Sequence, residues 1–257
     1  MPDPALALFV LPDIPLVMPD DDLAALILNA VRQSGIDPRS GDIFAVAQKI
    51  VSKAEGRIVT LHDVVVSPQA RQLAERTEKD PRAVQLILDE SRRVVRERPG
   101  VIIVEHRLGL VLANAGIDRS NVAGDEDTVL LLPENPDESA TRLRSALEAE
   151  FNVQLGVVIT DSFGRPWRLG TTGVAIGAAG ITVLDDRRGK PDIFGREMQV
   201  AEVAIADGLA AAAGLLMGEG AERSPVILMR FGGVGRPEVS AQTAADIIRA
   251  GDEDLFR

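Results

Sequence analysis

The segment Ile159–Ile181, ITDSFGRPWRLGTTGVAIGAAGI, constrains the fold of this chain more than any other stretch. The apolar run at 155–160 predicts a buried strand that ends in an acid and a hydroxyl, Asp161 and Ser162, before a Gly-Arg-Pro turn. Glycines recur from 170 to 180 and leave the backbone open to a ligand or to another chain segment. Either the acid and hydroxyl hold a divalent cation, or the segment is a strand, a turn and a close-packed glycine strand without chemistry.

Composition limits the class of protein. The chain has 257 residues, 46% of them hydrophobic, which suffices for one large domain or two small ones. No apolar run approaches the roughly 20 residues that cross a bilayer, and the N-terminus lacks a signal-peptide pattern. Cysteine is absent, which excludes disulfides and thiolate chemistry and predicts a cytoplasmic protein. With only His62 and His106, a multi-histidine metal site is not expected.

The charge distribution indicates what kind of ligand to expect. The formal net charge of −11 argues against nucleic-acid or membrane-surface partners. Residues 161–200 and 41–58 carry +1 each, so the remainder carries −13. These two comparatively basic islands favour small anionic ligands bound locally, unless they are simply solvated loops.

Helical and strand patterns alternate irregularly, which predicts an α+β fold rather than a doubly wound parallel sheet. We expect residues 1–257 to form a single unit of two intertwined lobes, without a separate C-terminal domain. Helices are expected from 23 to 34, from 68, from 81 to about 96, and over 136–150, 198–217 and 241–251. Strands are expected over 5–10, 42–50, 101–106, 108–113, 129–132, 155–160 and 226–230, with a polar bend over 51–57.

Common nucleotide and nucleophile motifs are missing: there is no Walker-type phosphate loop, no dinucleotide fingerprint and no nucleophile elbow. Four polar loops remain, each directly after an apolar run. They hold Ser52 with Lys53, Asp118 with Asn121, Asp161 with Ser162, and Gly218 with Glu219 and Gly220. If these loops meet at strand ends, their carboxylates, lysine and glycines suit Mg²⁺ or Mn²⁺ with a polyphosphate.

Four long motifs occur in one order along the chain: VAQKIVSKAEGRIV (46–59), ANAGIDRSNV (113–122), the segment 159–181, and FGREMQVAEVAIADGLAAAAGLLMGEG (194–220). Together they closely resemble the coenzyme F420 glutamate ligase family, the γ-glutamyl ligases that elongate the tail of a deazaflavin coenzyme. The resemblance runs from about Leu11 to Arg230 and so covers most of the chain.

The resemblance implies GTP as cosubstrate, Mg²⁺ or Mn²⁺, a homodimer, and a family-specific fold distinct from P-loop, Rossmann and ATP-grasp proteins. It assigns nucleotide contacts to Leu11, Pro12, Asp13, Ile14, Gln48, Lys53, Asn121, Gly218 and Gly220. It assigns metal ligands to Asp118, Asp161, Ser162 and Glu219, the last standing where many members carry an amide.

The implied reaction is GTP-driven amide formation through an acyl phosphate, with Lys53, Asp118 and Asp161 in the catalytic roles. The substrates would be the glutamate-free deazaflavin precursor and L-glutamate, followed by further γ-linked glutamate. From charge, we expect Arg165, Arg168 and the loop 185–196 to receive the anionic precursor or glutamate. The alternatives are the same chemistry on another carboxylate, a non-catalytic nucleotide- or deazaflavin-binding module, or an oxidoreductase.

Overall fold

The computed structural model describes residues 6–119, 127–232, 238–251, 253 and 254, and over these it shows the expected α+β fold. The helices are α1 (Leu23–Ser34), α2 (Gln48–Ala54), α3 (Pro68–Thr77), α4 (Pro81–Asp89), α5 (Pro136–Phe151) and α6 (Ile205–Met217). The strands are β1 (Leu6–Val10), β2 (Ile43–Ala47), β3 (Ile58–Thr60), β4 (Ser91–Arg98), β5 (Val101–His106), β6 (Val111–Ala113), β7 (Thr128–Leu130), β8 (Gly156–Arg165), β9 (Arg168–Ala179), β10 (Leu184–Asp186), β11 (Glu202–Ala204) and β12 (Val226–Phe231). No described helix combines the length and the apolarity that a bilayer crossing requires.

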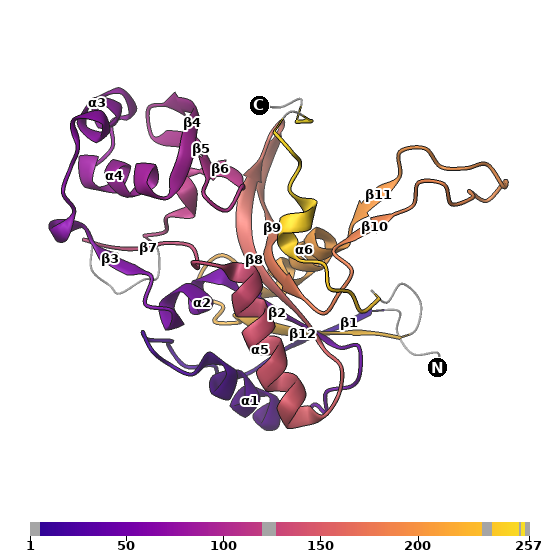
Figure 1. Cartoon of the computed structure of the whole chain (residues 1–257). Helices are drawn as coiled ribbons and strands as arrows, with labels where there is room; N and C mark the ends of the chain where they lie inside the picture. The colour runs from indigo at the N-terminus through magenta and orange to yellow at the C-terminus, as the bar shows by residue number, and fades with distance from the viewer. Residues whose placement is uncertain (1–5, 120–126, 233–237, 252, 255–257) are drawn as a thin grey trace.

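A five-stranded sheet with the order β1-β12-β2-β8-β9 forms the centre of the molecule (Figure 1). β2 and β8 are parallel, while the other neighbours are antiparallel, so β1, β2 and β8 all run in the same direction. Alternate side chains of β2 enter different cores: Phe44 and Val46 pack with α1 and α5, whereas Ile43 and Ala45 pack with α6. Helices therefore cover the sheet on both faces.

The first helix begins and ends where the sequence predicts. The Asp22 side chain accepts a hydrogen bond from the Ala25 amide at 3.0 Å, and Gly35 ends the helix in the left-handed region at φ 68°. Two predicted helices are shorter: α6 starts at Ile205 rather than 198, and the C-terminal segment holds only a 3-10 turn, Ala244–Ile247. Residues 202–204 instead pair as β11 with β10.

The glycine-rich segment is strand β9, and two of its glycines lie directly against helices. A methyl group on Gly173 would stand 2.3 Å from the Ala210 carbonyl oxygen in α6, and one on Gly177 would stand 2.5 Å from the Pro136 carbonyl oxygen in α5. Backbone atoms cannot yield as a flexible side chain can. These glycines therefore allow the two helices to pack closely on the sheet. This agrees with the close-packed glycine strand considered in the sequence analysis, and it leaves no room for a ligand at Gly173 or Gly177.

We expect Gly173→Ala to lower the free energy of unfolding by about 1–3 kcal/mol, because the added methyl group overpacks the contact with α6. Urea denaturation monitored by circular dichroism measures the change. Gly208→Ala is the matched control: it lies on α6 with open space around it, and alanine there favours the helix by up to about 1 kcal/mol. Equal stability of the Gly173 variant and the parent protein would contradict the packing argument.

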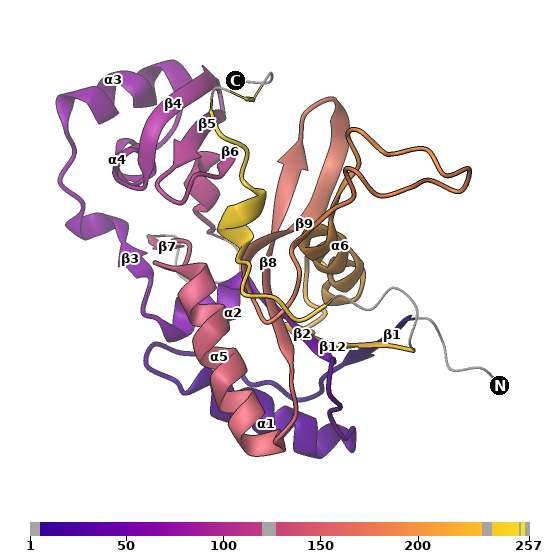
Figure 2. The ribbon, with the colours of Figure 1, turned by 45° about the vertical axis from the view of Figure 1, so that its right-hand side comes forward.

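A second part of the chain, 61–117, lies to one side of the sheet and has its own core of α3, α4, β4 and β5 (Figures 1 and 2). The prediction that the third helix continues to about residue 96 is wrong. α4 ends at Asp89, and 91–98 form the edge strand β4, in which Val94 pairs with Val104 of β5 and packs on this core. That the two parts form intertwined lobes of a single unit stays a prediction.

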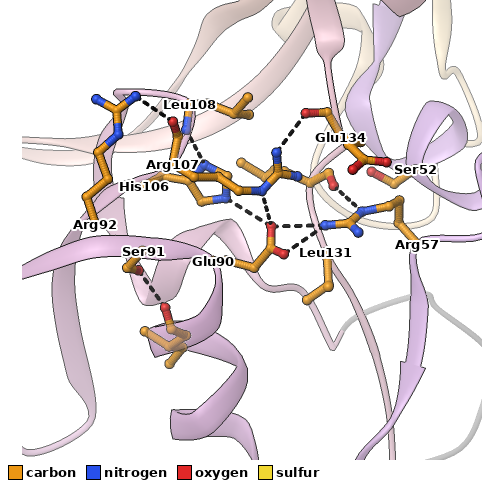
Figure 3. A network of polar contacts seen from close by, with 12 residues as sticks. Ser52, Arg57, Glu90, Ser91, Arg92, His106, Arg107, Leu108, Leu131 and Glu134 are labelled. Atoms are coloured by element: carbon orange, nitrogen blue, oxygen red, sulfur yellow. Dashed lines mark hydrogen bonds and ion pairs between the residues drawn. The ribbon is translucent and has the colours of Figure 1, made fainter.

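A buried carboxylate ties this second part to the chain that follows α2 (Figure 3). Arg57 donates to both oxygens of Glu90 at 2.9 Å, and Arg107 donates to one of them at 3.0 Å. His106 Nδ1 accepts the Leu108 amide at 3.0 Å, which leaves Nε2 to face Glu90 at 3.3 Å. Burial raises the pKa of Glu90, but the close approach of His106 and of the two arginines outweighs it and lowers that pKa to about 2.

Candidate functional site

Strand direction brings the predicted loops to one end of the central sheet, at the carboxyl ends of β1, β2 and β8. β1, β2 and β8 run in the same direction, so the segments that follow them leave at the same end, where β12 begins. The Leu11 amide donates to the Val226 carbonyl at 3.1 Å, and the Ala47 amide donates to the Pro225 carbonyl at 2.8 Å. In open parallel sheets, ligands bind in crevices outside the carboxyl ends of the strands, and β2 and β8 are the parallel pair of this sheet.

Helix α2 starts directly where β2 ends and carries Gln48 and Lys53, both buried. The predictions of a strand to residue 50 and a polar bend over 51–57 are wrong here. Ile50 and Val51 enter the core, and Gln48 Nε2 donates to Ser52 Oγ at 2.5 Å across one helical turn. Burial lowers the pKa of Lys53, as does the nearby charge of Lys49.

Asp118 is fixed through its backbone and reaches the same helix with its side chain. Its amide and carbonyl exchange hydrogen bonds with Leu130 at 3.0 and 2.9 Å. Its Oδ2 lies 2.6 Å from Lys49 Nζ, and its charge raises the pKa of Lys53. Asn121, the predicted nucleotide contact of this loop, lies outside the described residues.

Asp161 and Ser162 lie within β8, not at its exit, because the strand continues past the end of β2 to Arg165. Burial raises the pKa of Asp161, the Ser162 amide and Lys49 oppose the rise, and the charges of Asp118 and Glu219 add to it; the net result is a pKa of about 7. Ser162 Oγ donates to Glu219 Oε1 at 2.5 Å. Segments 118, 161–162 and 219, far apart in sequence, therefore share one electrostatic site.

The donor set fits a hard divalent cation in its chemistry. The carboxylates of Asp118, Asp161 and Glu219 and the Ser162 hydroxyl are oxygen ligands, and the pKa of Asp161 is raised mainly by burial, with a smaller contribution from the charges of Asp118 and Glu219. Among the residues that the structure describes, no three acidic or histidine side chains are grouped so that they could hold a metal ion by themselves. Lys49 forms an ion pair with Asp118, and Ser162 donates a hydrogen bond to Glu219. The predicted metal ligands are thus held by these neighbouring side chains.

The predicted nucleotide loops occupy the same end of the sheet with different exposure. Leu11 is fully buried and Ile14 packs against the core, so their side chains support the fold, whereas Asp13 is exposed with φ 54°. Pro12 lies between them and is partly exposed. Gly218 ends α6 at φ 70°, and the Gly220 amide donates to a Glu222 oxygen at 2.7 Å.

The two predicted substrate arginines lie apart from the carboxylates. Arg165 and Arg168 pair at the exposed tip of the β8–β9 hairpin, which extends from the sheet (Figure 2). Their substrate role stays a prediction. Basic residues of the loop 185–196 form ion pairs within the loop: Arg188 with Asp186 at 2.6 Å and Lys190 with Asp185 at 3.1 Å.

Two site residues were missed from the sequence, Lys49 and Thr171. Thr171 Oγ1 donates to Glu219 at 3.4 Å from the facing strand β9. Lys49 precedes Lys53 by one helical turn, so a helical reading of 48–54 would have placed both amines on one face. Nothing in the sequence marks Thr171 apart from its place in the long motif.

Comparison with known proteins identifies the family. The model of the F420-0:gamma-glutamyl ligase family matches residues 13–231, and the chain belongs to that family. A coenzyme F420:L-glutamate ligase of Methanopyrus kandleri is 46% identical over 245 residues, 94% of this chain and 93% of the relative. Proteins of the same name from Methanothermobacter thermautotrophicus and Halobacterium salinarum are 45% and 40% identical over 217 and 255 residues. These alignments cover 84% and 97% of this chain, and 85% and 94% of the relatives.

Proposed function

We propose that this protein is a GTP-dependent ligase that joins L-glutamate to the glutamate-free precursor of coenzyme F420 and then adds γ-linked glutamate. The observation that carries the proposal is the meeting of Lys53, Asp118, Asp161 and Glu219 at one end of the sheet, beside the ends of β1 and α6. The names of relatives matched over almost the whole chain support the substrates.

The reaction needs positioning and charge neutralisation rather than a covalent nucleophile. A precursor carboxylate oxygen attacks the γ-phosphorus of GTP, the bond to GDP breaks, and an acyl phosphate forms. The glutamate amine then attacks the acyl carbon, phosphate leaves, and the amine proton passes to solvent. Later additions use the γ-carboxylate of the attached glutamate.

In this proposal Lys53 binds the phosphate chain, because its buried position beside Asp118 fixes the amine with little freedom. Asp118, Asp161, Ser162 and Glu219 would hold Mg²⁺ or Mn²⁺, which supplies neutralisation of phosphate charge when bound. The exposed loop at Asp13 and the glycines after α6 would contact the nucleotide.

We also propose a homodimer, as the family resemblance implies. Large apolar side chains are exposed on the two projecting hairpins: Trp167 is 91% and Leu169 98% exposed near the β8–β9 tip, and Ile193 is 92% exposed on the β10–β11 arm. Sedimentation equilibrium measures the state, and a monomer at micromolar concentration would contradict it.

Release of phosphate from GTP tests the reaction. We expect release only when precursor, L-glutamate and Mn²⁺ are all present, and a precursor labelled with ¹⁸O in its carboxylate should pass one ¹⁸O to the phosphate. Release with glutamate and another carboxylate, but not with the precursor, would replace the acceptor. Nucleotide binding without any release would favour a non-catalytic module.

A further inference from the structure

Lys49 is placed against a predicted metal ligand, and the proposed reaction gives it no role. Its Nζ lies 2.6 Å from Asp118 Oδ2, and both side chains are a little under one-third exposed. Asp118 is held in place by its two backbone hydrogen bonds to Leu130. The carboxylate is therefore the fixed partner of the pair and the long lysine side chain is the movable one.

The surroundings of this ion pair contain both signs of charge. Lys49 lies close enough to Lys53 to lower that amine's pKa, and close enough to Asp161 to oppose the rise of that carboxyl's pKa. Lys53 is only 8% exposed, whereas the side chain of Lys49 is 28% exposed. The singly charged ammonium group of Lys49 thus lies beside Asp118 and near Asp161, carboxylates of the kind that bind a divalent cation.

Resting on the proposed function, we propose that Lys49 and the divalent metal bind Asp118 in alternation, and that the displaced Lys49 then binds the phosphate chain of the nucleotide. An ammonium group 2.6 Å from Asp118 Oδ2 opposes the binding of a dication by the same carboxylate, because the two positive charges repel each other. Lys49 and Lys53 lie one helical turn apart, so both amines can reach a single polyphosphate.

The exchange predicts opposite effects on two ligands. Without Lys49 the carboxylate loses the ammonium group that competes with the metal, so the metal alone should bind more tightly. The nucleotide loses a cationic contact, so it should bind more weakly. A residue that only supports the fold would not improve metal binding while weakening nucleotide binding.

The test compares Lys49→Met with Lys49→Arg and the parent protein. We expect Lys49→Met to lower the Kd for Mn²⁺ alone, measured by electron paramagnetic resonance, by about tenfold, which corresponds to the gain or loss of one good charged contact. The Kd for GTP with Mg²⁺, measured by calorimetry, should rise by a similar factor. Lys49→Arg keeps the charge and should resemble the parent protein in both titrations, while thermal melting confirms that each variant is folded.

The outcomes separate this inference from the proposed function. If Mn²⁺ binds the parent protein and Lys49→Met binds it equally or more weakly, the alternation is wrong and the site stands. If tighter metal binding appears in both variants, charge is not the cause and the inference also fails. If Mn²⁺ binds none of the three proteins, the proposed metal site itself is wrong.

Discussion

Replacing Asp161 by asparagine should lower kcat for GTP-dependent ligation by about 10³-fold, the scale of losing one main source of charge stabilisation in phosphoryl transfer. The amide keeps the size of the side chain and can still accept the Ser162 amide at 2.8 Å, so the strand should be unchanged. What is lost is the negative charge beside Asp118 and Glu219. Steady-state phosphate release with precursor and glutamate measures the effect.

Asp207→Asn provides the matched control for this variant. Asp207 is also a partly buried carboxyl whose pKa burial raises, but its Oδ1 accepts the Ala175 amide at 2.9 Å on the strand next to β8. An asparagine oxygen can keep that bond, so activity should stay within about twofold of the parent protein. Equal losses in the two variants, or a parental rate for Asp161→Asn in limiting Mn²⁺, would remove Asp161 from the reaction.

Replacing Glu90 by glutamine should lower the free energy of unfolding at pH 7 by about 3 kcal/mol. This follows from the fall of the Glu90 pKa from 4.5 to about 2, at about 1.4 kcal/mol for each unit. The variant leaves Arg57 and Arg107 beside a neutral group in a site where Glu90 is only 12% exposed. Urea denaturation at pH 7 measures the difference.

The pH dependence gives a second measurement on the same residue. Because the folded-state pKa of Glu90 is lowered, its contribution is complete above about pH 4.5 and is lost as the pH falls toward 2. The stability difference between parent and variant should therefore shrink below pH 4.5. Glu97→Gln breaks the surface pair with Arg76 and should change stability much less. A difference that stays constant with pH would show that the charge of Glu90 is not responsible.

Local sequence signals predicted those elements whose ends are fixed by local chemistry. Asp22 and Gly35 bound α1, and Ser67 and Asp80 cap α3 and α4, as the sequence indicates. Strands β1 and β12 also lie close to their predicted ranges, whereas β2 ends earlier and β8 continues further than predicted. Their order does not follow from the sequence, because it depends on pairing between residues as distant as Leu6 and Phe231.

The missed elements were decided by tertiary packing. Residues 48–54 carry polar side chains in a strand-like context, yet Gln48 and Ser52 satisfy each other when buried, which allows the helix. The sequence predicts a helix that continues to about residue 96, but pairing with β5 makes 91–98 an edge strand. Local propensity cannot report a partner that lies elsewhere in the chain.

The site was predictable as a set of residues and not as an arrangement. The motifs named Lys53, Asp118, Asp161, Ser162 and Glu219 together because the family resemblance joins them. The contacts between them depend on strand register and on the Leu130 bridge to Asp118, which no motif encodes. Lys49 emerged only from that arrangement, through its contact with Asp118.

The central claim is that this site attaches glutamate to the deazaflavin precursor at the expense of GTP. Mass spectrometry of the products tests it most directly, with purified protein, glutamate-free precursor, L-glutamate, GTP and Mn²⁺. We expect mass gains in whole glutamyl steps that require GTP and metal and that disappear in Asp161→Asn. No mass gain by the parent protein, with GTP bound in a calorimetric control, would contradict the claim.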